Sequence, residues 1–314
     1  MAFLLVLSSC DDGDLTIEEV SFEDVPLQRC NSNPYLLYKI NGGESIILYL
    51  PQSGAFTDEA TNPGEPRVYP INNTNRLIYR SYRGNINQSN ICDVIPPATP
   101  TVAEEWTATS GTIEITTTAV VSDNPQFPGG QRITGFRHSI MIRNLDFLKP
   151  DGTSQFYLEY NLNDFVSTGG VTNMPFAFDD NLQICGGNRV FKYVNNEALT
   201  LDIDPALIVS EATTTPRVGY TSASTNRLSY RLFANAPLTA DYFCASPVPT
   251  LPNITQEWVA DQGEGESGRI EVTTTTSGPG VFVHEIHLKN ARLRRGNTSF
   301  LLASDYLLGY LTTN

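Results

Sequence analysis

An internal repeat constrains this chain more than any other feature of its sequence. When the residues from about 185 onward are laid against those from about 30 onward, Cys185 falls on Cys30 and Cys244 falls on Cys92. Each second cysteine is followed 14 residues later by one of the chain's two tryptophans. Other landmarks recur in the same order: Pro66-Arg67-Val68 with Pro216-Arg217-Val218, Thr74-Asn75-Arg76-Leu77 with Thr225-Asn226-Arg227-Leu228, and Ile142-Arg143-Asn144 with Leu288-Lys289-Asn290. The chain is therefore a tandem duplication with an offset of about 152 residues.

The repeat predicts how four of the five cysteines pair. Two copies of one fold should carry the same covalent bond, so we expect disulfides between Cys30 and Cys92 and between Cys185 and Cys244. Each would close a loop of about 60 residues, which is worth roughly 4 kcal/mol on a chain-entropy model. A metal site is the competing interpretation, but the chain has no Cys-x-x-Cys pair of the kind that zinc sites use. Paired cysteines indicate an oxidising compartment.

The length of each copy suits one well-packed domain, so we expect domains at residues 29–165 and 181–314, joined by a linker at 166–180. Segments such as ESIILYL, GTIEITTTAV and RIEVTTTT alternate apolar residues with polar ones, which is typical of strands. Clusters among the 20 prolines and 23 glycines separate these segments. The predicted fold class is all-β, with two tandem, internally duplicated antiparallel β-sandwich domains. A barrel or a jelly roll is the alternative.

The N-terminus carries a short apolar run, residues 2–7, that is far below the roughly 20 residues of a membrane span. It ends in Leu7-Ser8-Ser9-Cys10, which is similar to a bacterial lipobox, and the aspartates that follow resemble the surface-export signal of Bacteroidetes-type lipoproteins. The resemblance implies a signal-peptide remnant at 1–9, a lipidated Cys10 and an acidic tether at 10–28. It also implies attachment to the outer membrane at the cell surface. An aspartate directly after the cysteine resembles an inner-membrane retention signal in other Gram-negative groups, so a periplasm-facing location is the alternative.

The most informative polar residues are six arginines retained through the duplication: Arg67, Arg76, Arg80, Arg217, Arg227 and Arg231. Arginine suits planar, bidentate pairing with carboxylates. The set therefore predicts a structural Arg–Glu network in each sandwich, and contact with an anion or an acidic glycan is the alternative. A further basic group, Arg292, Arg294 and Arg295, occurs only in the second copy beside a predicted turn.

The three histidines do not predict a catalytic or metal site. His284 and His287 should lie on opposite faces of a strand, and their spacing differs from that of zinc-binding helices. We expect His138 to have no counterpart in the second copy. The chain contains no Gly-x-Ser-x-Gly motif and no phosphate-binding loop, so the sequence predicts no enzyme, no metal and no cofactor.

Carboxylates recur in both copies at Glu105 and Glu257 and at Glu114 and Glu271. Paired carboxylates serve glycosidases, but these lie on or beside predicted strands, so salt bridges to the repeated arginines are the preferred interpretation. The acidic stretches at 178–181 and 202–205 lack the spacing of a calcium-binding loop and are interpreted as loop carboxylates.

The formal net charge of −14 argues against nucleic acid as a partner, because phosphates would be repelled. The copies differ by insertions near 122–134 in the first and near 261–268 in the second, and surface insertions often carry binding specificity. The sequence predicts a lipid-anchored envelope protein that binds a protein partner without catalysis. A glycan-binding or glycan-processing surface protein is the alternative.

Overall fold

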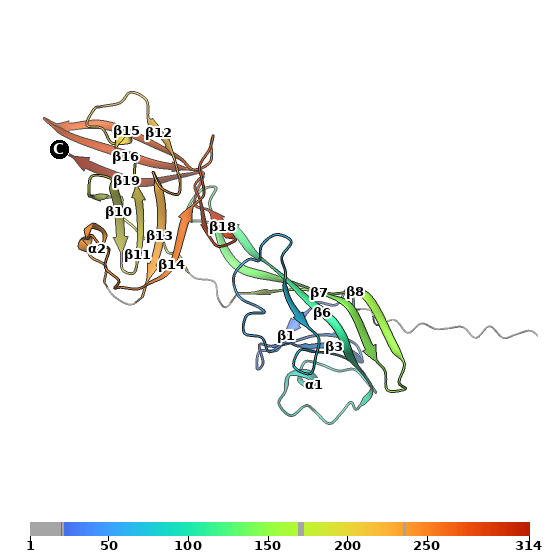
Figure 1. Ribbon diagram of the computed structural model, residues 1–314. Helices are drawn as coiled ribbons and strands as arrows, with labels where there is room; N and C mark the ends of the chain where they lie inside the picture. Colours follow the sequence, from blue (N-terminus) through green and yellow to red (C-terminus); the bar gives the residue numbers. More distant parts are fainter. Residues whose placement is uncertain (1–19, 21, 169–172, 235–236) are drawn as a thin grey trace, which may run out of the picture. The chain divides into compact units, whose positions relative to one another are not determined.

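The computed structural model describes residues 20, 22–168, 173–234 and 237–314 (Figure 1). Antiparallel sheets form two regions, at about 28–167 and 183–313, and each region holds one disulfide. The predicted all-β class and both predicted disulfide pairs are therefore confirmed. Cys10, the signal-peptide remnant and most of the tether lie outside the described residues.

Contacts group the chain into two compact units, each of which is treated by itself. Unit 1 consists of the chain up to Pro51, Pro70–Thr112 and Ile142–Asn163, and unit 2 consists of Gln52–Tyr69, Ile113–Met141 and Asp164–Asn314. Unit 2 therefore combines all of the second repeat with parts of the first.

The first repeat contains eight strands and one short helix. They are β1 (Gln28–Arg29), β2 (Leu36–Asn41), β3 (Glu44–Tyr49), β4 (Arg67–Pro70), β5 (Arg76–Tyr82), α1 (Ser89–Cys92), β6 (Val102–Asp123), β7 (Gln131–Leu148) and β8 (Ser154–Ser167). They form one sheet in the order β1-β2-β3-β5-β6-β7-β8, with β4 pairing with β6. The last three strands are long, with 22, 18 and 14 residues (Figure 1).

The described residues of the second repeat form eleven strands and two short helices. They are β9 (Gln183–Cys185), β10 (Arg189–Val194), β11 (Glu197–Asp202), η1 (Pro205–Leu207), β12 (Arg217–Tyr220), β13 (Arg227–Phe233), α2 (Ala240–Cys244), β14 (Ile254–Ala260), β15 (Arg269–Gly278), β16 (Val281–Lys289), β17 (Arg292–Arg295), β18 (Thr298–Leu301) and β19 (Asp305–Thr313). They form two sheets, in the orders β18-β17-β14-β13-β11-β10-β9 and β12-β15-β16-β19.

Residues with a left-handed backbone conformation lie within or between the long strands of both repeats. Asn144 within β7 has φ 51°, and Asn290, its partner in the sequence repeat, has φ 49° and lies between β16 and β17. Gly111 within β6 has φ 142°, and a Cβ there would lie 2.9 Å from Ile71 Cδ1. Asparagine and glycine are the residues that tolerate such conformations, so the residue types at these positions suit the backbone.

Apolar burial explains why the alternating segments fold as strands. In the second repeat, side chains from both sheets share one core cluster, which includes Leu199, Leu228 and Trp258 from one sheet and Ile270 and Ile286 from the other. A separate cluster of Phe191, Phe233, Phe243 and their neighbours lies around α2. Its counterpart in the first repeat groups Cys30, Tyr38, Ile47 and Ile91.

The disulfides join the start of each repeat to the end of its short helix. Their Cα atoms are 5.5 Å apart for Cys30–Cys92 and 5.4 Å apart for Cys185–Cys244, within the usual range for disulfides. No helix of the described residues is long and apolar enough to cross a membrane.

Candidate functional site

The first repeat buries a histidine in a chain of polar side chains, all of which belong to unit 2. Arg67 Nη1 donates a hydrogen bond to Thr117 Oγ1 (2.7 Å), and this hydroxyl lies 2.9 Å from His138 Nδ1. On the other side of the ring, His138 Nε2 lies 2.9 Å from Ser167 Oγ. The Ser167 hydroxyl also donates to Asp58 Oδ1 (2.7 Å). Because His138 is fully buried, this serine and histidine are not placed for attack on a substrate.

The second repeat contains a corresponding series of hydrogen-bonded side chains around His284. The expectation that His138 has no counterpart is therefore wrong. Arg217 Nη1 donates to Thr274 Oγ1 (3.0 Å), which lies 2.8 Å from His284 Nδ1, and His284 Nε2 lies 2.9 Å from Thr313 Oγ1. Burial, and then the nearby Arg217 cation, lowers the pKa of the His284 ring. The ring is therefore neutral at pH 7 and serves as a structural link between strands.

A second duplicated network surrounds a lysine in each repeat. In the first, Lys39 is fully buried and donates to Phe22 O (2.8 Å), and Tyr79 OH donates to Glu44 Oε1 (2.5 Å). Burial lowers the pKa of Lys39. Lys39 therefore donates to a backbone oxygen in the protein interior, and its side chain does not face an open site.

In the second repeat the corresponding lysine is Lys192, which donates to Leu308 O (2.6 Å) and Asp179 O (3.3 Å). Burial lowers its pKa to about 8. Glu197 accepts from Tyr230 OH (2.7 Å) and from the backbone N–H of Phe176 (3.0 Å). Neither network was predicted from the sequence, although the pattern Lys-x-x-x-x-Glu, which recurs at 39–44 and 192–197, indicates them.

Four of the six repeated arginines contact carboxylates or a ring on the strand surface. Arg80 Nε pairs with Glu105 (2.7 Å), and Glu257 accepts from both Arg231 (2.7 Å) and Arg227 (3.3 Å). The Arg76 guanidinium lies 5.4 Å from the centre of the Tyr49 ring. Arg76 and Arg80 both line a cavity of about 360 Å³ beside Tyr49. In the second repeat, Arg227 and Arg231 share Glu257.

The remaining pair, Arg67 and Arg217, supports backbone as well as the buried threonines. Arg67 Nη2 donates to Glu59 O (2.7 Å), and Arg217 Nη2 donates to Glu211 O (2.9 Å). Each arginine therefore fixes the loop that precedes its own strand.

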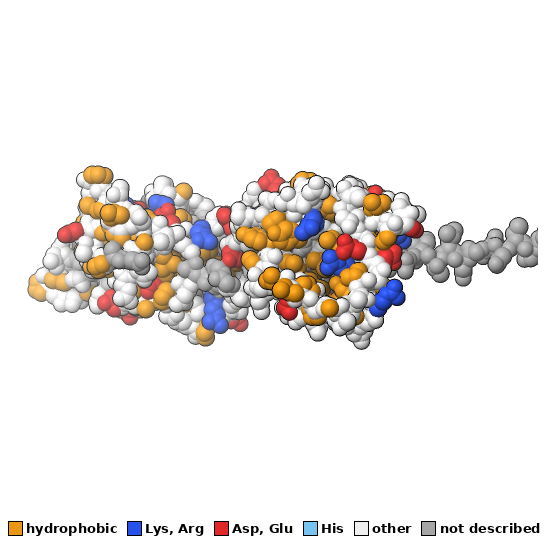
Figure 2. Space-filling model, turned by 90° about the horizontal axis from the view of Figure 1, so that it is seen from below, with side chains coloured by type: hydrophobic (Ala, Val, Ile, Leu, Met, Phe, Trp, Pro, Cys, Tyr) orange, Lys and Arg blue, Asp and Glu red, His pale blue; other side chains and the backbone are white. Residues whose placement is uncertain are grey.

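The basic group of the second copy is partnered within unit 2. Arg294 pairs with Asp261 (2.7 Å), Arg292 donates to Ser299 Oγ (3.4 Å) and the Arg295 guanidinium lies 5.1 Å from the centre of a tryptophan ring. Figure 2 shows a face of the molecule on which cationic and anionic side chains are scattered and do not gather in a patch of one sign.

His284 and His287 lie on opposite faces of β16, as expected. His284 is fully buried, whereas His287 is partly exposed between Glu285 (2.9 Å) and Asp305 (2.7 Å). These carboxylates raise the pKa of His287 against the opposing effect of partial burial. Among the described residues there is no group of three or more His, Cys, Asp or Glu side chains arranged to hold a metal ion.

The acidic stretches of the second repeat also have structural roles. Asp202 pairs with Arg189 (2.8 Å), Asp204 accepts from the backbone N–H of Ala206 (2.9 Å) at the start of η1, and Asp179 accepts from Asn181 N (3.0 Å). Glu271 pairs with Arg269 (2.9 Å) across the surface of β15.

Both tryptophans are core residues. Trp106 and Trp258 are 1 % and 2 % exposed, and they pack against Tyr79 (4.7 Å between ring centres) and Phe300 (5.3 Å) respectively. Neither ring offers a face on which a sugar could stack.

Each repeat exposes a proline-rich loop after its second cysteine, and in the first repeat the exposed Asp93 lies between Cys92 and this loop. In the first repeat the side chains of Val94 and Ile95 are 95 % and 86 % exposed. In the second, those of Val248 and Leu251 are 49 % and 69 % exposed. No charged residue occurs from 94 to 103 or from 245 to 256, and each loop contains three prolines.

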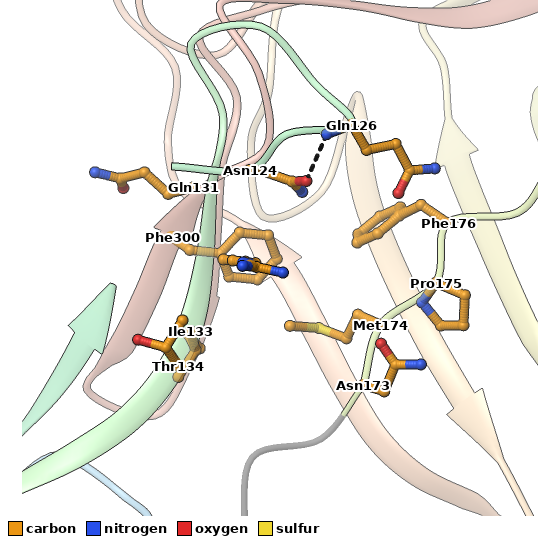
Figure 3. Close-up of a pocket in the computed structure, with 11 residues that line it drawn as sticks. Asn124, Gln126, Gln131, Ile133, Thr134, Asn173, Met174, Pro175, Phe176 and Phe300 are labelled. Carbon is orange, nitrogen blue, oxygen red and sulfur yellow. Dashed lines mark hydrogen bonds between the residues drawn. The ribbon is translucent and has the colours of Figure 1, made fainter. Parts of the chain in front are cut away.

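A cavity of about 430 Å³ lies in unit 2 beside the start of β7 (Figure 3). Its lining comprises Asn124, Gln126, Gln131, Arg132, Ile133, Thr134, Asn173, Met174, Pro175, Phe176 and Phe300. Figure 3 shows the side chains of Phe300, Phe176 and Met174 pointing toward one another across the space. The apolar side chains thus form a floor, and amide and hydroxyl groups form the rim.

Hydrogen bonds fix several of the polar side chains on this rim. Asn124 Oδ1 accepts from Gln126 N (3.0 Å), Gln131 Oε1 accepts from Leu301 N (3.2 Å) and Thr134 Oγ1 donates to Val120 O (3.2 Å). The rim is therefore held in place before any ligand arrives, which lowers the entropic cost of binding.

Part of the predicted linker, 166–180, lines this cavity, and residues 169–172 lie outside the described residues. Phe176 is 5 % exposed and stacks on Tyr230, with 4.3 Å between ring centres.

Searches of protein-family models, of curated proteins and of solved structures each found no match to the chain.

Proposed function

We propose that this chain is a non-enzymatic binding protein of the bacterial envelope, anchored by lipid on Cys10 and contacting an envelope protein partner. The observation that carries this proposal is the pair of exposed apolar loops that follow Cys92 and Cys244. The two disulfides support a compartment outside the cytoplasm.

The loops suit a protein partner for three physical reasons. Burying an exposed Val, Ile or Leu side chain gains about 1.5–3 kcal/mol, so Val94 and Ile95 together represent a substantial unused driving force. Prolines and the adjacent disulfide restrict the free loop, so less conformational entropy is lost on binding. Apart from Asp93 at the start of the first loop, the loops carry no charged residue, so an interface would bury few charged groups.

The polar groups of the cores support a binding role over a catalytic one. His138, His284, Lys39 and Lys192 are buried and hydrogen-bonded to neighbouring side chains or backbone oxygens. A general acid or base must reach its substrate, and these four side chains are buried.

The partner is tested by affinity purification of the lipidated chain from its own outer membrane. The loop variant carries Val94→Asp, Ile95→Asp, Val248→Asp and Leu251→Asp. The control carries Val68→Asp and Val218→Asp, which are exposed valines (56 % and 41 %) at matched positions of the two repeats. We expect one stoichiometric protein with the wild type and the control, and at least tenfold less with the loop variant. Equal recovery from all three chains, or no partner with any, would overturn the proposal.

The anchor is tested separately by mass spectrometry of the mature N-terminus. We expect a diacylated or triacylated Cys10, and a Cys10→Ser chain that moves to the soluble fraction. An unmodified Cys10 in the membrane-bound chain would show that attachment has another cause.

Glycan binding is a second candidate function, and the cavity in unit 2 favours it. The cavity combines an apolar floor with a rim of amide and hydroxyl groups, as small-molecule sites commonly do.

A further inference from the structure

The cavity in unit 2 is built by a segment that only the first repeat possesses. Residues 122–134, the insertion identified in the sequence, supply six of the lining residues. The tip of the insertion is anchored in unit 2, because Phe127 packs on Phe176 (5.7 Å) and Tyr306 (5.3 Å), and Pro128 O accepts from Ser304 N (3.1 Å). The duplicated fold does not by itself require this cavity, so the insertion is the feature that demands a functional explanation.

The charges around the cavity are unusual for this chain. None of the described aspartates or glutamates lines it, although the chain contains 34 acidic residues. The one charged lining residue is Arg132, whose Nε donates to Ser122 Oγ (3.4 Å) and which forms no ion pair among the described residues. By contrast Arg137, on the same strand, pairs with Asp164. A guanidinium without a carboxylate partner, at the rim of an acid-free cavity, is suited to an anionic group on a ligand.

The other lining groups restrict the ligand further. Four side-chain amides, of Asn124, Gln126, Gln131 and Asn173, offer both donors and acceptors. Such groups match a ligand rich in hydroxyls, each of which also donates and accepts. Met174 and Pro175 add an apolar surface that can pack on the C–H face of a sugar ring.

From these observations we infer that the cavity binds a carboxylate-bearing sugar unit, such as a uronic acid residue of an acidic glycan. Arg132 pairs with the carboxylate, the amides bind the hydroxyls, and the apolar floor packs on the ring. The volume of about 430 Å³ lies within the range of small-molecule sites. The inference rests on the glycan-binding candidate and is independent of the protein partner and of the exposed loops.

The test is calorimetric titration of the purified chain with D-glucuronic acid, D-glucose and acetate. We expect glucuronic acid to bind at least tenfold more tightly than either of the others, because only it carries both the carboxylate and the ring. Arg132→Gln should weaken the binding of glucuronic acid by about 10- to 100-fold, the usual cost of losing a charged hydrogen bond. Arg132→Lys should keep part of the affinity, since it retains the charge but not the bidentate geometry.

Arg83→Gln is the matched control, because Arg83 is an exposed arginine in unit 1 and its loss changes net charge equally. Its affinity should equal that of the wild type. Glucuronic acid that binds no better than glucose or acetate, or binding that survives Arg132→Gln, would overturn the inference. Tighter binding of a peptide carboxylate such as acetyl-alanine, with the same dependence on Arg132, would overturn the assignment to a sugar. None of these results bears on the affinity purification that tests the protein partner.

Discussion

The two repeats share one strand order but differ in whether their strands are continuous. In the first, β6, β7 and β8 each run without a break through the sheet. In the second, each of these strands is divided, giving β14 and β15, β16 and β17, and β18 and β19, and the halves belong to two different sheets. The order β8-β7-β6-β5-β3-β2-β1 thus corresponds to β18-β17-β14-β13-β11-β10-β9.

The difference shows that strand order can be preserved while strands that are continuous in one repeat are divided in the other. Between β14 and β15 lie residues 261–268, where the second repeat has its insertion. Backbone hydrogen bonds close this segment on itself, for example from Ser267 N to Glu264 O (2.9 Å). The Arg–Thr–His link recurs in both repeats, so this part of the buried side-chain chemistry changed less than strand continuity.

The largest expected effect concerns the disulfides, which join cysteines that are 62 and 59 residues apart in the sequence. If loop closure dominates, the pair Cys30→Ser, Cys92→Ser and the pair Cys185→Ser, Cys244→Ser should each lower the free energy of unfolding by about 4 kcal/mol. Urea unfolding measures both, because Trp106 lies in unit 1 and Trp258 in unit 2. Replacing one tryptophan by Phe leaves a reporter for the other unit. Losses that differ by more than about 2 kcal/mol would break the equivalence of the repeats.

The buried lysine of the second repeat predicts a pH dependence. The pKa of Lys192 is about 8 in the folded chain against 10.5 ordinarily, so between these values the unfolded chain binds more protons and stability rises with pH. Burial also raises the pKa values of Tyr230 and Tyr306, whose ionisation in the unfolded chain opposes folding above about pH 10. We expect unit 2 to gain about 2 kcal/mol between pH 8 and 10.

Lys192→Met should abolish this gain while preserving the fold. The matched variant Lys39→Met, read from Trp106 in unit 1, should show a change of the same sign, because burial also lowers the pKa of Lys39. Urea unfolding at several pH values is the measurement. A gain that persists in Lys192→Met would assign it to another group.

The histidine networks predict a smaller, equal effect in the two repeats. Thr117 and Thr274 are fully buried, and each hydroxyl lies between an arginine and a histidine. Thr117→Val and Thr274→Val keep the shape but remove the buried hydroxyl that bonds both the arginine and the histidine, which costs about 1–3 kcal/mol. Thr275→Val, at an exposed neighbouring position, is the control and should change stability by less than about 0.5 kcal/mol. Both losses should be read from Trp258, since both networks lie in unit 2.

The disulfides were predictable because the repeat restricts which cysteines can pair. The all-β class was predictable because alternation of apolar and polar residues indicates strands with one buried face. It missed the match of His138 with His284, although the landmark Ile142/Leu288 places them at the same offset. The cavity was not predictable, because its lining comes from residues 124–134, 173–176 and 300, which only the folded chain brings together. The division of the strand into β14 and β15 was not predictable either, because alternation of apolar and polar residues does not show where the insertion at 261–268 interrupts the pairing.

The smallest expected effect concerns the surface pairs that the sequence did predict. Glu257 accepts from two arginines, Arg231 and Arg227, whereas Glu105 pairs with Arg80. All these side chains are partly exposed, so solvent screens them and each pair is worth at most about 1 kcal/mol. We expect Glu257→Gln to cost about 0.5–1 kcal/mol and Glu105→Gln about half as much, measured by urea unfolding at low salt.

Salt separates this electrostatic effect from a packing effect. In 1 M salt the Debye length falls to about 3 Å, so the costs of both variants should shrink and the difference between the repeats should disappear. A double-mutant cycle with Arg231→Gln then isolates the pairwise energy, which should fall in the same proportion. A cost for Glu257→Gln that is unchanged by salt would mean that its side chain stabilises the second repeat through packing, and that the two arginine sets are not electrostatic equivalents.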